Sequence, residues 1–134
     1  MKKSKSINKL KKEYWTVLSR YVRESSAIDG MVQCYTCGQV DLFTNMDLGH
    51  YWGRNYGATY FDVKNNLRIQ CKHCNRFMEG NKPAFANRLL VELGIEGLEQ
   101  LETKAKMKYH FDRFALEEGA KEYKRKLKKL REAR

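Results

Sequence analysis

Four cysteines form two pairs with the spacing of a zinc site. Both pairs read C-x2-C and 33 residues separate them; the four are Cys34, Cys37, Cys71 and Cys74. Each such turn presents two thiolates to one ion, and two turns complete a tetrahedral Zn²⁺ shell. Four thiolates leave no open coordination position, so this zinc would be structural. A redox pair or four unrelated buried thiols are the alternatives. His73, inside the second pair, is not needed as a ligand and is expected to be exposed.

A second set of residues suits phosphodiester hydrolysis. A hard cation such as Mg²⁺ or Mn²⁺ prefers oxygen ligands. Asp47 offers a carboxylate, and Asn75, which directly follows the last cysteine, offers an amide oxygen. A neutral His50 can take a proton from an attacking water molecule. Zinc binding would fix Asn75 through its neighbour Cys74, at the start of a helix.

The spacing of Asp47 and His50 raises a geometric problem. Residues three apart in a regular strand face opposite sides of it. The two side chains converge only if the strand bulges, and Gly49 is the residue that permits a bulge. We therefore predict an irregularity near Gly49. Each residue also has an ordinary interpretation: Asp47 can begin a turn, His50 can be a core or surface histidine, and Asn75 can cap a helix.

The charge of the chain favours a polyanionic partner. Lys and Arg number 27 against 16 Asp and Glu, for a net charge of +11. The excess lies at the two ends, in residues 1–23 and 104–134, around a slightly acidic centre. Basic ends favour nucleic acid, with salt-sensitive binding; solvated lysine-rich helix faces are the alternative. No apolar run approaches the roughly 18 residues of a membrane span, and no secretory signal is expected. We therefore expect a cytoplasmic protein.

The elements that must position these residues are mostly helices. The pattern predicts helices over 6–27, 71–78, 83–93, 96–107 and 110–134, strands over 46–52 and 67–70, and a short extended stretch over 58–61. Ser6 is expected to cap the first helix, Pro83 to lie in the first turn of the helix over 83–93, and Gly94 to end that helix. In the last helix, the apolar side chains from Phe114 to Leu130 are expected on one side. The expected fold is α+β and mainly helical. Three regions form one compact unit: a basic N-terminal helix (1–29), a zinc-containing core (30–82) and a helical C-terminal region with a basic tail (83–134). The long terminal helix can pack on the N-terminal helix or on a second subunit.

These motifs resemble a known family. Two CxxC pairs, an acid–histidine strand and an Asn after the last Cys are similar to the zinc-containing HNH, or ββα-metal, endonucleases of the endonuclease VII-like branch. More closely, the run DLGHYWGRNYGATYFDVKNNLRIQCKHCNRFMEGN at 47–81 resembles the phage NinG (Rap) recombination proteins. The resemblance extends with less specificity over residues 12–130.

The resemblance implies a small HNH-like ββα-metal core and a DNA endonuclease acting on branched recombination intermediates, such as Holliday junctions or D-loops. It makes His50 the general base, and Asp47 and Asn75 the ligands of a catalytic Mg²⁺ or Mn²⁺. Asn66 would orient the site through backbone hydrogen bonds. The chain departs from most HNH enzymes by carrying Asn75 where they have histidine, and a neutral amide is a weaker ligand.

Partners follow from the same resemblance. The expected partner is branched DNA in the cytoplasm of a bacterial host, with no membrane and no small-molecule substrate, and a homodimer is possible because branched DNA has two-fold arrangements. Arg54, Arg76 and Lys82 are the candidate DNA contacts near the site. Two alternatives remain: a non-catalytic zinc-containing DNA- or RNA-binding recombination accessory protein, and a protein-interaction module that uses the terminal helices.

Overall fold

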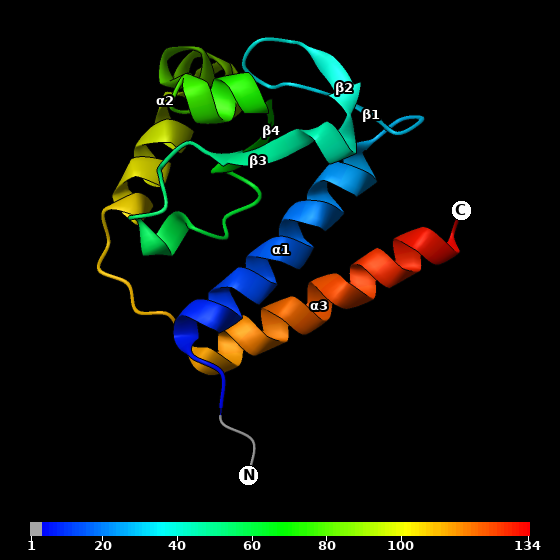
Figure 1. Ribbon diagram of the computed structural model, residues 1–134. Helices are drawn as coiled ribbons and strands as arrows, with labels where there is room; N and C mark the ends of the chain where they lie inside the picture. Colours follow the sequence, from blue (N-terminus) through cyan, green and yellow to red (C-terminus); the bar gives the residue numbers. More distant parts are fainter. Residues whose placement is uncertain (1–3) are drawn as a thin grey trace.

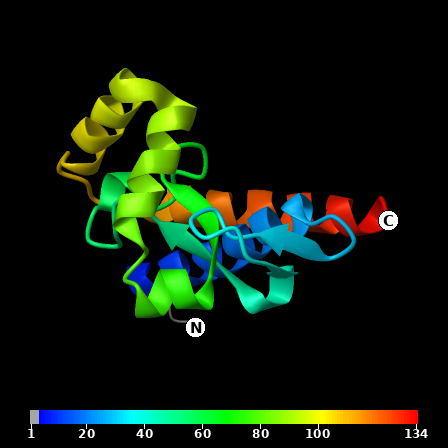
Figure 2. The same ribbon diagram turned by 90° about the horizontal axis from the view of Figure 1, so that it is seen from above.

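The structure is a computed structural model that describes residues 4–134. Its elements are α1 (Ile7–Ser26), β1 (Met31–Gln33), β2 (Val40–Leu42), β3 (Met46–His50), β4 (Leu67–Cys71), α2 (Lys82–Ala105) and α3 (Arg113–Glu132), with short helical turns η1 (Phe43–Asn45), η2 (Gly57–Thr59) and η3 (His73–Phe77) between them. Helices α1 and α3 lie side by side below the two small two-stranded sheets in Figure 1, and α2 lies at the upper left; Figure 2 shows the same arrangement from above. This confirms the predicted mixed and mainly helical fold. None of the described helices is long and apolar enough to cross a membrane.

Helix α1 follows the sequence pattern closely. Ser6 caps its first turn, because the Ser6 side-chain oxygen accepts a hydrogen bond from the backbone N–H of Lys9 at 3.1 Å. Leu10 and Leu18 lie on its buried face. The helix ends at Ser26, close to the predicted end at 27. Burial of one such leucine contributes roughly 1.5–3 kcal/mol to folding.

Strands β3 and β4 form the ribbon that carries the candidate catalytic residues. They pair antiparallel, from Met46 opposite Cys71 to His50 opposite Leu67. One face packs on α1 through a cluster that includes Leu18 and Leu48. The chain then turns directly into η3, so the order is strand, strand and short helix. The predicted helix over 71–78 is thus one π-helical turn, and the predicted strand over 46–52 ends two residues early.

The hairpin of β1 and β2 was not predicted. Each strand has only three residues, too few to show the alternation that marks a strand in a sequence. The first cysteine pair lies in the turn that joins them. The short extended stretch predicted at 58–61 is also wrong, because η2 places residues 57–59 in a 3-10 turn.

Helix α2 is interrupted at Gly94, the residue predicted to end a helix. Pro83 lies in the first turn, as predicted. Gly94 has φ 75° and ψ 172°, a conformation that strongly favours glycine, and the helix kinks there. Phe85 and Leu89 before the kink and Leu101 after it are buried together. The predicted break between two helices is therefore a kink between two arms.

Helix α3 lies side by side with α1 and runs in the same direction (Figure 1). Arg113 at its start donates a hydrogen bond to the backbone carbonyl of Lys5, and Arg131 near its end contacts Glu24. Gly119 allows the close approach, because a Cβ there would lie 2.5 Å from the ring of Tyr14. Helix α3 therefore packs on the N-terminal helix, which is the first of the two partners predicted for it.

Phe114 is the exception on the predicted apolar side of α3. Its side chain is 68% exposed, whereas Leu116 and Ala120 are buried. Phe114 was predicted to share a side with Leu116 and Ala120, but it precedes Leu116 by two positions, which is about 200° around the helix, so it lies on the opposite side.

Glu24 links the C-terminal ends of α1 and α3. Its buried carboxylate accepts hydrogen bonds from Arg131 at 3.1 Å and from Arg20 at 2.9 Å. The hydrogen bond from Arg131 is the main cause that lowers the pKa of Glu24 to about 2, and Arg20 adds to it while burial opposes it. The carboxylate therefore stabilises the folded state in its charged form.

Replacing Glu24 by glutamine is expected to lower the free energy of unfolding at pH 7 by an amount toward the lower end of roughly 1.5–3 kcal/mol, because the arginine partners are partly solvated. The pKa of Glu24 is lower in the folded than in the unfolded state, so the contribution is complete above about pH 4.5 and is lost as the pH falls toward 2. Denaturant unfolding at several pH values measures it. Glu132→Gln is the matched control on the exposed side of α3. Equal losses for the two variants would contradict the assigned role of Glu24.

Candidate active site and metal centre

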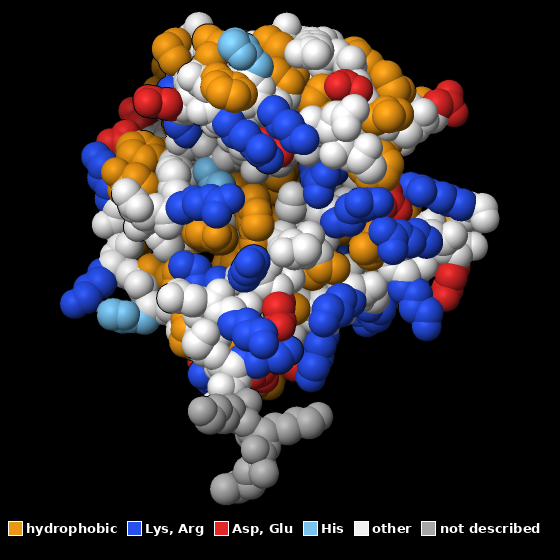
Figure 3. All heavy atoms as spheres, in the orientation of Figure 1, with side chains coloured by type: hydrophobic (Ala, Val, Ile, Leu, Met, Phe, Trp, Pro, Cys, Tyr) orange, Lys and Arg blue, Asp and Glu red, His pale blue; other side chains and the backbone are white. Residues whose placement is uncertain are grey.

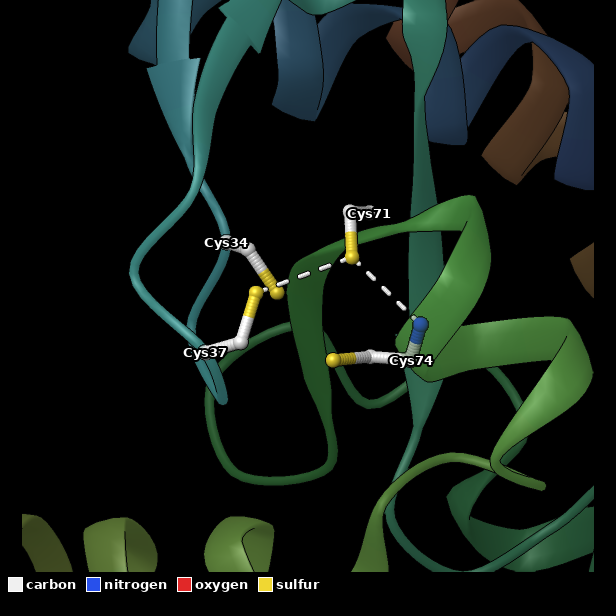
Figure 4. A group of neighbouring side chains, drawn as sticks. All are labelled: Cys34, Cys37, Cys71 and Cys74. Carbon is white, nitrogen blue, oxygen red and sulfur yellow. Dashed lines mark hydrogen bonds between the residues drawn. The ribbon is translucent and has the colours of Figure 1, made fainter.

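The four cysteines come together at one point. The sulfur atoms of Cys34, Cys37, Cys71 and Cys74 all lie within 4.8 Å of one another (Figure 4). The Cys37 and Cys71 sulfurs are 3.7 Å apart, and tetrahedral Zn–S bonds of about 2.3 Å would place two sulfurs about 3.8 Å apart. The cluster can therefore hold a metal ion such as zinc. His73 is exposed, as predicted.

Backbone hydrogen bonds form both cysteine turns. In the β1–β2 turn, Cys34 donates its N–H to the Gln39 carbonyl at 2.8 Å and accepts from the Gly38 N–H at 3.0 Å. In the second turn, the Cys74 N–H points at the Cys71 sulfur at 3.4 Å. An N–H directed at sulfur favours the thiolate, which is the form that binds a metal. This N–H opposes the burial that, without a metal, raises the pKa of Cys71 to about 12.

Asp47 and Asn75 meet directly beside this cluster. The Asn75 side-chain amide donates a hydrogen bond from Nδ2 to Asp47 Oδ2 at 3.0 Å. Arg76 also binds the carboxylate through both oxygens, at 2.9 and 3.0 Å. The Arg76 side chain is 60% exposed, whereas Asp47 is 15% exposed. The structure thus brings the predicted carboxylate and amide together and adds an arginine.

His50 lies at the end of the same strand in an aromatic pocket. Its ring stacks on Trp15 with centroids 4.5 Å apart. Nε2 lies 2.9 Å from the Tyr60 carbonyl, which can only accept, so the neutral ring carries its proton on Nε2. Burial, reinforced by Arg54 and Lys82, lowers the pKa of His50 to about 4 although the Tyr60 carbonyl opposes the change. At neutral pH the Nδ1 lone pair is therefore available.

A basic cleft of about 390 Å³ runs along the outer edge of β3, between α1 and η3. Asp47 and Asn75 lie in its wall. The other lining residues include four cationic side chains, Arg23, Arg54, Lys72 and Arg76, with Trp15 and Ser19 from α1. Lys and Arg side chains also crowd the face of the molecule over α1 and α3 (Figure 3). The cleft is therefore suited to an anion.

The predicted irregularity at Gly49 is absent. The register of β3 with β4 is continuous from Met46 to His50, one residue opposite one. Both Asp47 and Leu48, on opposite faces of the strand, line the cleft because β3 pairs with no second strand among the described residues. Gly49 instead allows the Gln70 side chain to pack against the backbone of β3, since a Cβ at Gly49 would lie 1.9 Å from the Gln70 side-chain oxygen.

The predicted backbone contacts of Asn66 are present. Its side-chain oxygen accepts from the Trp52 N–H at 2.7 Å, and its Nδ2 donates to the carbonyls of Trp52 and Thr59. Asn66 is completely buried. It therefore holds the loop between β3 and β4, which supplies Tyr60 to His50. Its contribution to catalysis stays a prediction.

The three predicted DNA contacts differ in their surroundings. Lys82 is half-buried, and its ammonium donates to the backbone carbonyls of His50 and Tyr51. Lys82 therefore stabilises the backbone at the end of β3. Arg76 is bound to Asp47. Arg54 is exposed, with its guanidinium 5.7 Å from the Trp15 ring centre.

Sequence reasoning missed the contribution of α1 to the site. Trp15, Ser19 and Arg23 are spaced by four, so they form one stripe along the helix and line the cleft. Arg23 also donates to the carbonyls of Phe43 and Met46. A polar and aromatic stripe beside the apolar face was the signal that could have found them.

Comparison with known proteins identifies the family of the chain. Residues 1–133 match the family described as bacteriophage lambda NinG protein. The match covers nearly the whole chain, so it extends past the 12–130 region of the sequence resemblance. No curated protein and no solved structure was found to match.

Proposed function

Because the chain belongs to the bacteriophage lambda NinG family, which makes it a phage recombination-related protein, we propose that it is a metal-dependent DNA endonuclease. Its expected substrates are branched recombination intermediates such as Holliday junctions or D-loops. The catalytic part of the proposal is an HNH-like ββα-metal core made by β3, β4 and η3.

One observation carries the proposal: a carboxylate and an amide meet at 3.0 Å in a cleft lined by four cations. Cationic side chains attract the phosphate backbone of DNA. Asp47 and Asn75 together offer the oxygen chemistry that a hard divalent cation prefers. The donor set fits such a cation after two side-chain movements: the Asn75 amide must turn its oxygen toward the cleft, and the exposed Arg76 must leave the carboxylate. When bound, the cation would stabilise the negative charge on the phosphate.

His50 has the environment of a general base. The Tyr60 carbonyl holds its proton on Nε2, and the free Nδ1 can accept a proton from an attacking water molecule. Trp15 and Tyr60 hold the ring and exclude solvent from its faces. The low pKa keeps the ring unprotonated at neutral pH, so the base is in its active form.

The second part of the proposal is that the cysteine cluster holds structural zinc. It joins the β1–β2 turn to the start of η3, where Asn75 follows Cys74. The zinc would then fix the backbone of Asn75 relative to β3. Four thiolates fill its coordination shell, so it takes no part in the chemical step.

The test is a cleavage assay with the purified full chain on linear, flap and four-way DNA of equal sequence content, with Mg²⁺ or Mn²⁺ added. Cleavage that requires the divalent cation and favours the branched substrates supports the proposal. No cleavage of any substrate, by protein that carries zinc and binds DNA, would reject it.

Arg54 is expected to contact phosphate. Replacing Arg54 by alanine should weaken DNA binding and lower the slope of log affinity against log salt by about 1. Arg88→Ala is the matched control, because Arg88 is also exposed but does not line the cleft. Titrations at four salt concentrations measure both slopes. An unchanged slope for the Arg54 variant would remove Arg54 from the interface.

The alternative function is a zinc-containing DNA- or RNA-binding recombination accessory protein without catalysis. The observation that favours it is the Arg76–Asp47 ion pair, which occupies both oxygens of the proposed metal-binding carboxylate. Such a protein would bind branched DNA without divalent cations and would cut nothing in the assay above.

A further inference from the structure

Gln70 carries an unsatisfied oxygen beside the Asp47–Asn75 pair. Its side chain is completely buried, and its Nε2 donates to the Gly80 carbonyl at 2.8 Å and to the Thr36 hydroxyl at 3.1 Å. Its Oε1 is buried and has no hydrogen-bond partner among the described residues. A buried acceptor without a donor costs about 1–3 kcal/mol. Such a group in a folded protein therefore calls for a physical explanation.

The orphan oxygen and the Asn75 amide lie close together beside Gly49. A Cβ on Gly49 would be 1.9 Å from Gln70 Oε1 and 3.1 Å from Asn75 Oδ1, so these two oxygens are at most about 5 Å apart. Both are acceptors, and no donor of the described chain serves the first of them. Gln70 is also the register partner of Asp47, so the two side chains leave the ribbon on the same face.

A half-turn of the Asn75 amide would exchange the positions of its oxygen and its nitrogen. Its Nδ2, which now donates to Asp47, would move toward Gln70 Oε1 and could donate there. Its Oδ1 would take the place of Nδ2, 3.0 Å from Asp47 Oδ2. Two adjacent ligand oxygens of octahedral Mg²⁺, at about 2.0–2.1 Å from the ion, are about 2.9 Å apart. The existing spacing of the pair thus already matches one edge of a magnesium shell.

We propose that Gln70 is a positioning residue for Asn75, and that the Asn75 amide has two orientations. Without a divalent cation, Nδ2 donates to Asp47, as in the structure. With the cation, Nδ2 donates to Gln70 Oε1, and Oδ1 joins Asp47 as a ligand. The buried oxygen of Gln70 is therefore the acceptor for Asn75 Nδ2 in the second orientation. Gly49 supports this arrangement, because any larger residue would occupy the space of the Gln70 carboxamide. The inference rests on the divalent-cation site of the proposed function.

The first test uses the wild-type protein and needs no catalysis. In the second orientation the Asn75 Nδ2 protons face the Cα of Gly49. Titration of the zinc-loaded chain with Mg²⁺ should therefore produce nuclear Overhauser contacts between the Asn75 side-chain amide and the Gly49 Hα protons. Contacts that are unchanged at saturating Mg²⁺ would overturn the proposal.

The second test measures Mn²⁺ affinity by titration of its electron paramagnetic resonance signal. Gln70→Met removes the acceptor and should weaken Mn²⁺ binding by roughly 10–100-fold, as loss of an outer-shell partner typically does. Gln70→Glu keeps an acceptor oxygen but loses the donors to Gly80 and Thr36, so it should bind Mn²⁺ at least as tightly as wild type. Zinc content and melting temperature identify any variant that fails to fold.

The outcomes separate the two proposals. Wild-type protein that binds no Mn²⁺ at Asp47 would remove both the catalytic cation and the role of Gln70. Wild-type protein that binds Mn²⁺, together with a folded Gln70→Met variant that binds it equally well, would overturn only the role of Gln70.

Discussion

Replacement of His50 by alanine is expected to reduce cleavage of four-way DNA by roughly 10²–10⁴-fold, the usual contribution of a general base. The loss should appear in the chemical step, because a general base takes a proton from the attacking water and does not hold the DNA. Single-turnover cleavage measures the rate, and a gel-shift titration without divalent cation measures binding. Binding is expected to stay within about twofold of wild type.

The control for this variant is His73→Ala. His73 is an exposed histidine on η3, so its removal changes the histidine count without touching the buried ring. Since His50 packs on Trp15 and Tyr60, its variant can lose stability as well; near-ultraviolet circular dichroism and zinc content establish that it is folded. A folded His50→Ala protein that cuts as fast as wild type would refute the general-base role.

Removal of the metal from the cysteine cluster is expected to abolish the cooperative melting transition of residues 30–82. Structural zinc contributes an apparent 10–16 kcal/mol in small zinc domains, about as much as the total stability of many domains. The described core here is small: the cluster around Val32, Met46 and the buried cysteines is one of three separate hydrophobic clusters. Without the metal, the link that the four thiolates make between the β1–β2 turn and η3 is lost.

The measurement compares thermal unfolding of the protein as purified with protein treated with a strong chelator under reducing conditions, and restores zinc at one equivalent. Atomic absorption should find one zinc per chain. Cys74→Ser should resemble the chelated protein, whereas His73→Ala should keep its zinc because four thiolates suffice. Equal melting curves with and without chelator, from protein with four reactive thiols, would exclude a structural metal.

Features of the fold and site that depend on residues close together in the sequence could be predicted from the sequence. The Ser6 cap, the Pro83 start and the Gly94 break each follow from one residue and its backbone preference. The meeting of Asp47 with Asn75 was also predictable, because Asn75 is bonded to Cys74 and the cysteine pairs had to converge.

The rest depends on packing between distant segments. The bulge was predicted so that Asp47 and His50 could share one face of the strand, but β3 is regular, and of the two only Asp47 lines the cleft. The purpose of Gly49 is visible only with the buried Gln70 beside it. Likewise, the pocket of His50 is completed by Trp15 and Tyr60, which lie 35 residues before it and ten after it.

The parallel pairing of α1 and α3 also unites the two basic ends of the chain. Each helix has 20 residues and is therefore about 30 Å long. At 3.4 Å per base pair, that length equals the rise of roughly nine base pairs of duplex. If the chain binds DNA as proposed, the basic residues of α1 and α3 lie along one length of about nine base pairs, and a shorter duplex arm would leave some of these residues without a phosphate partner.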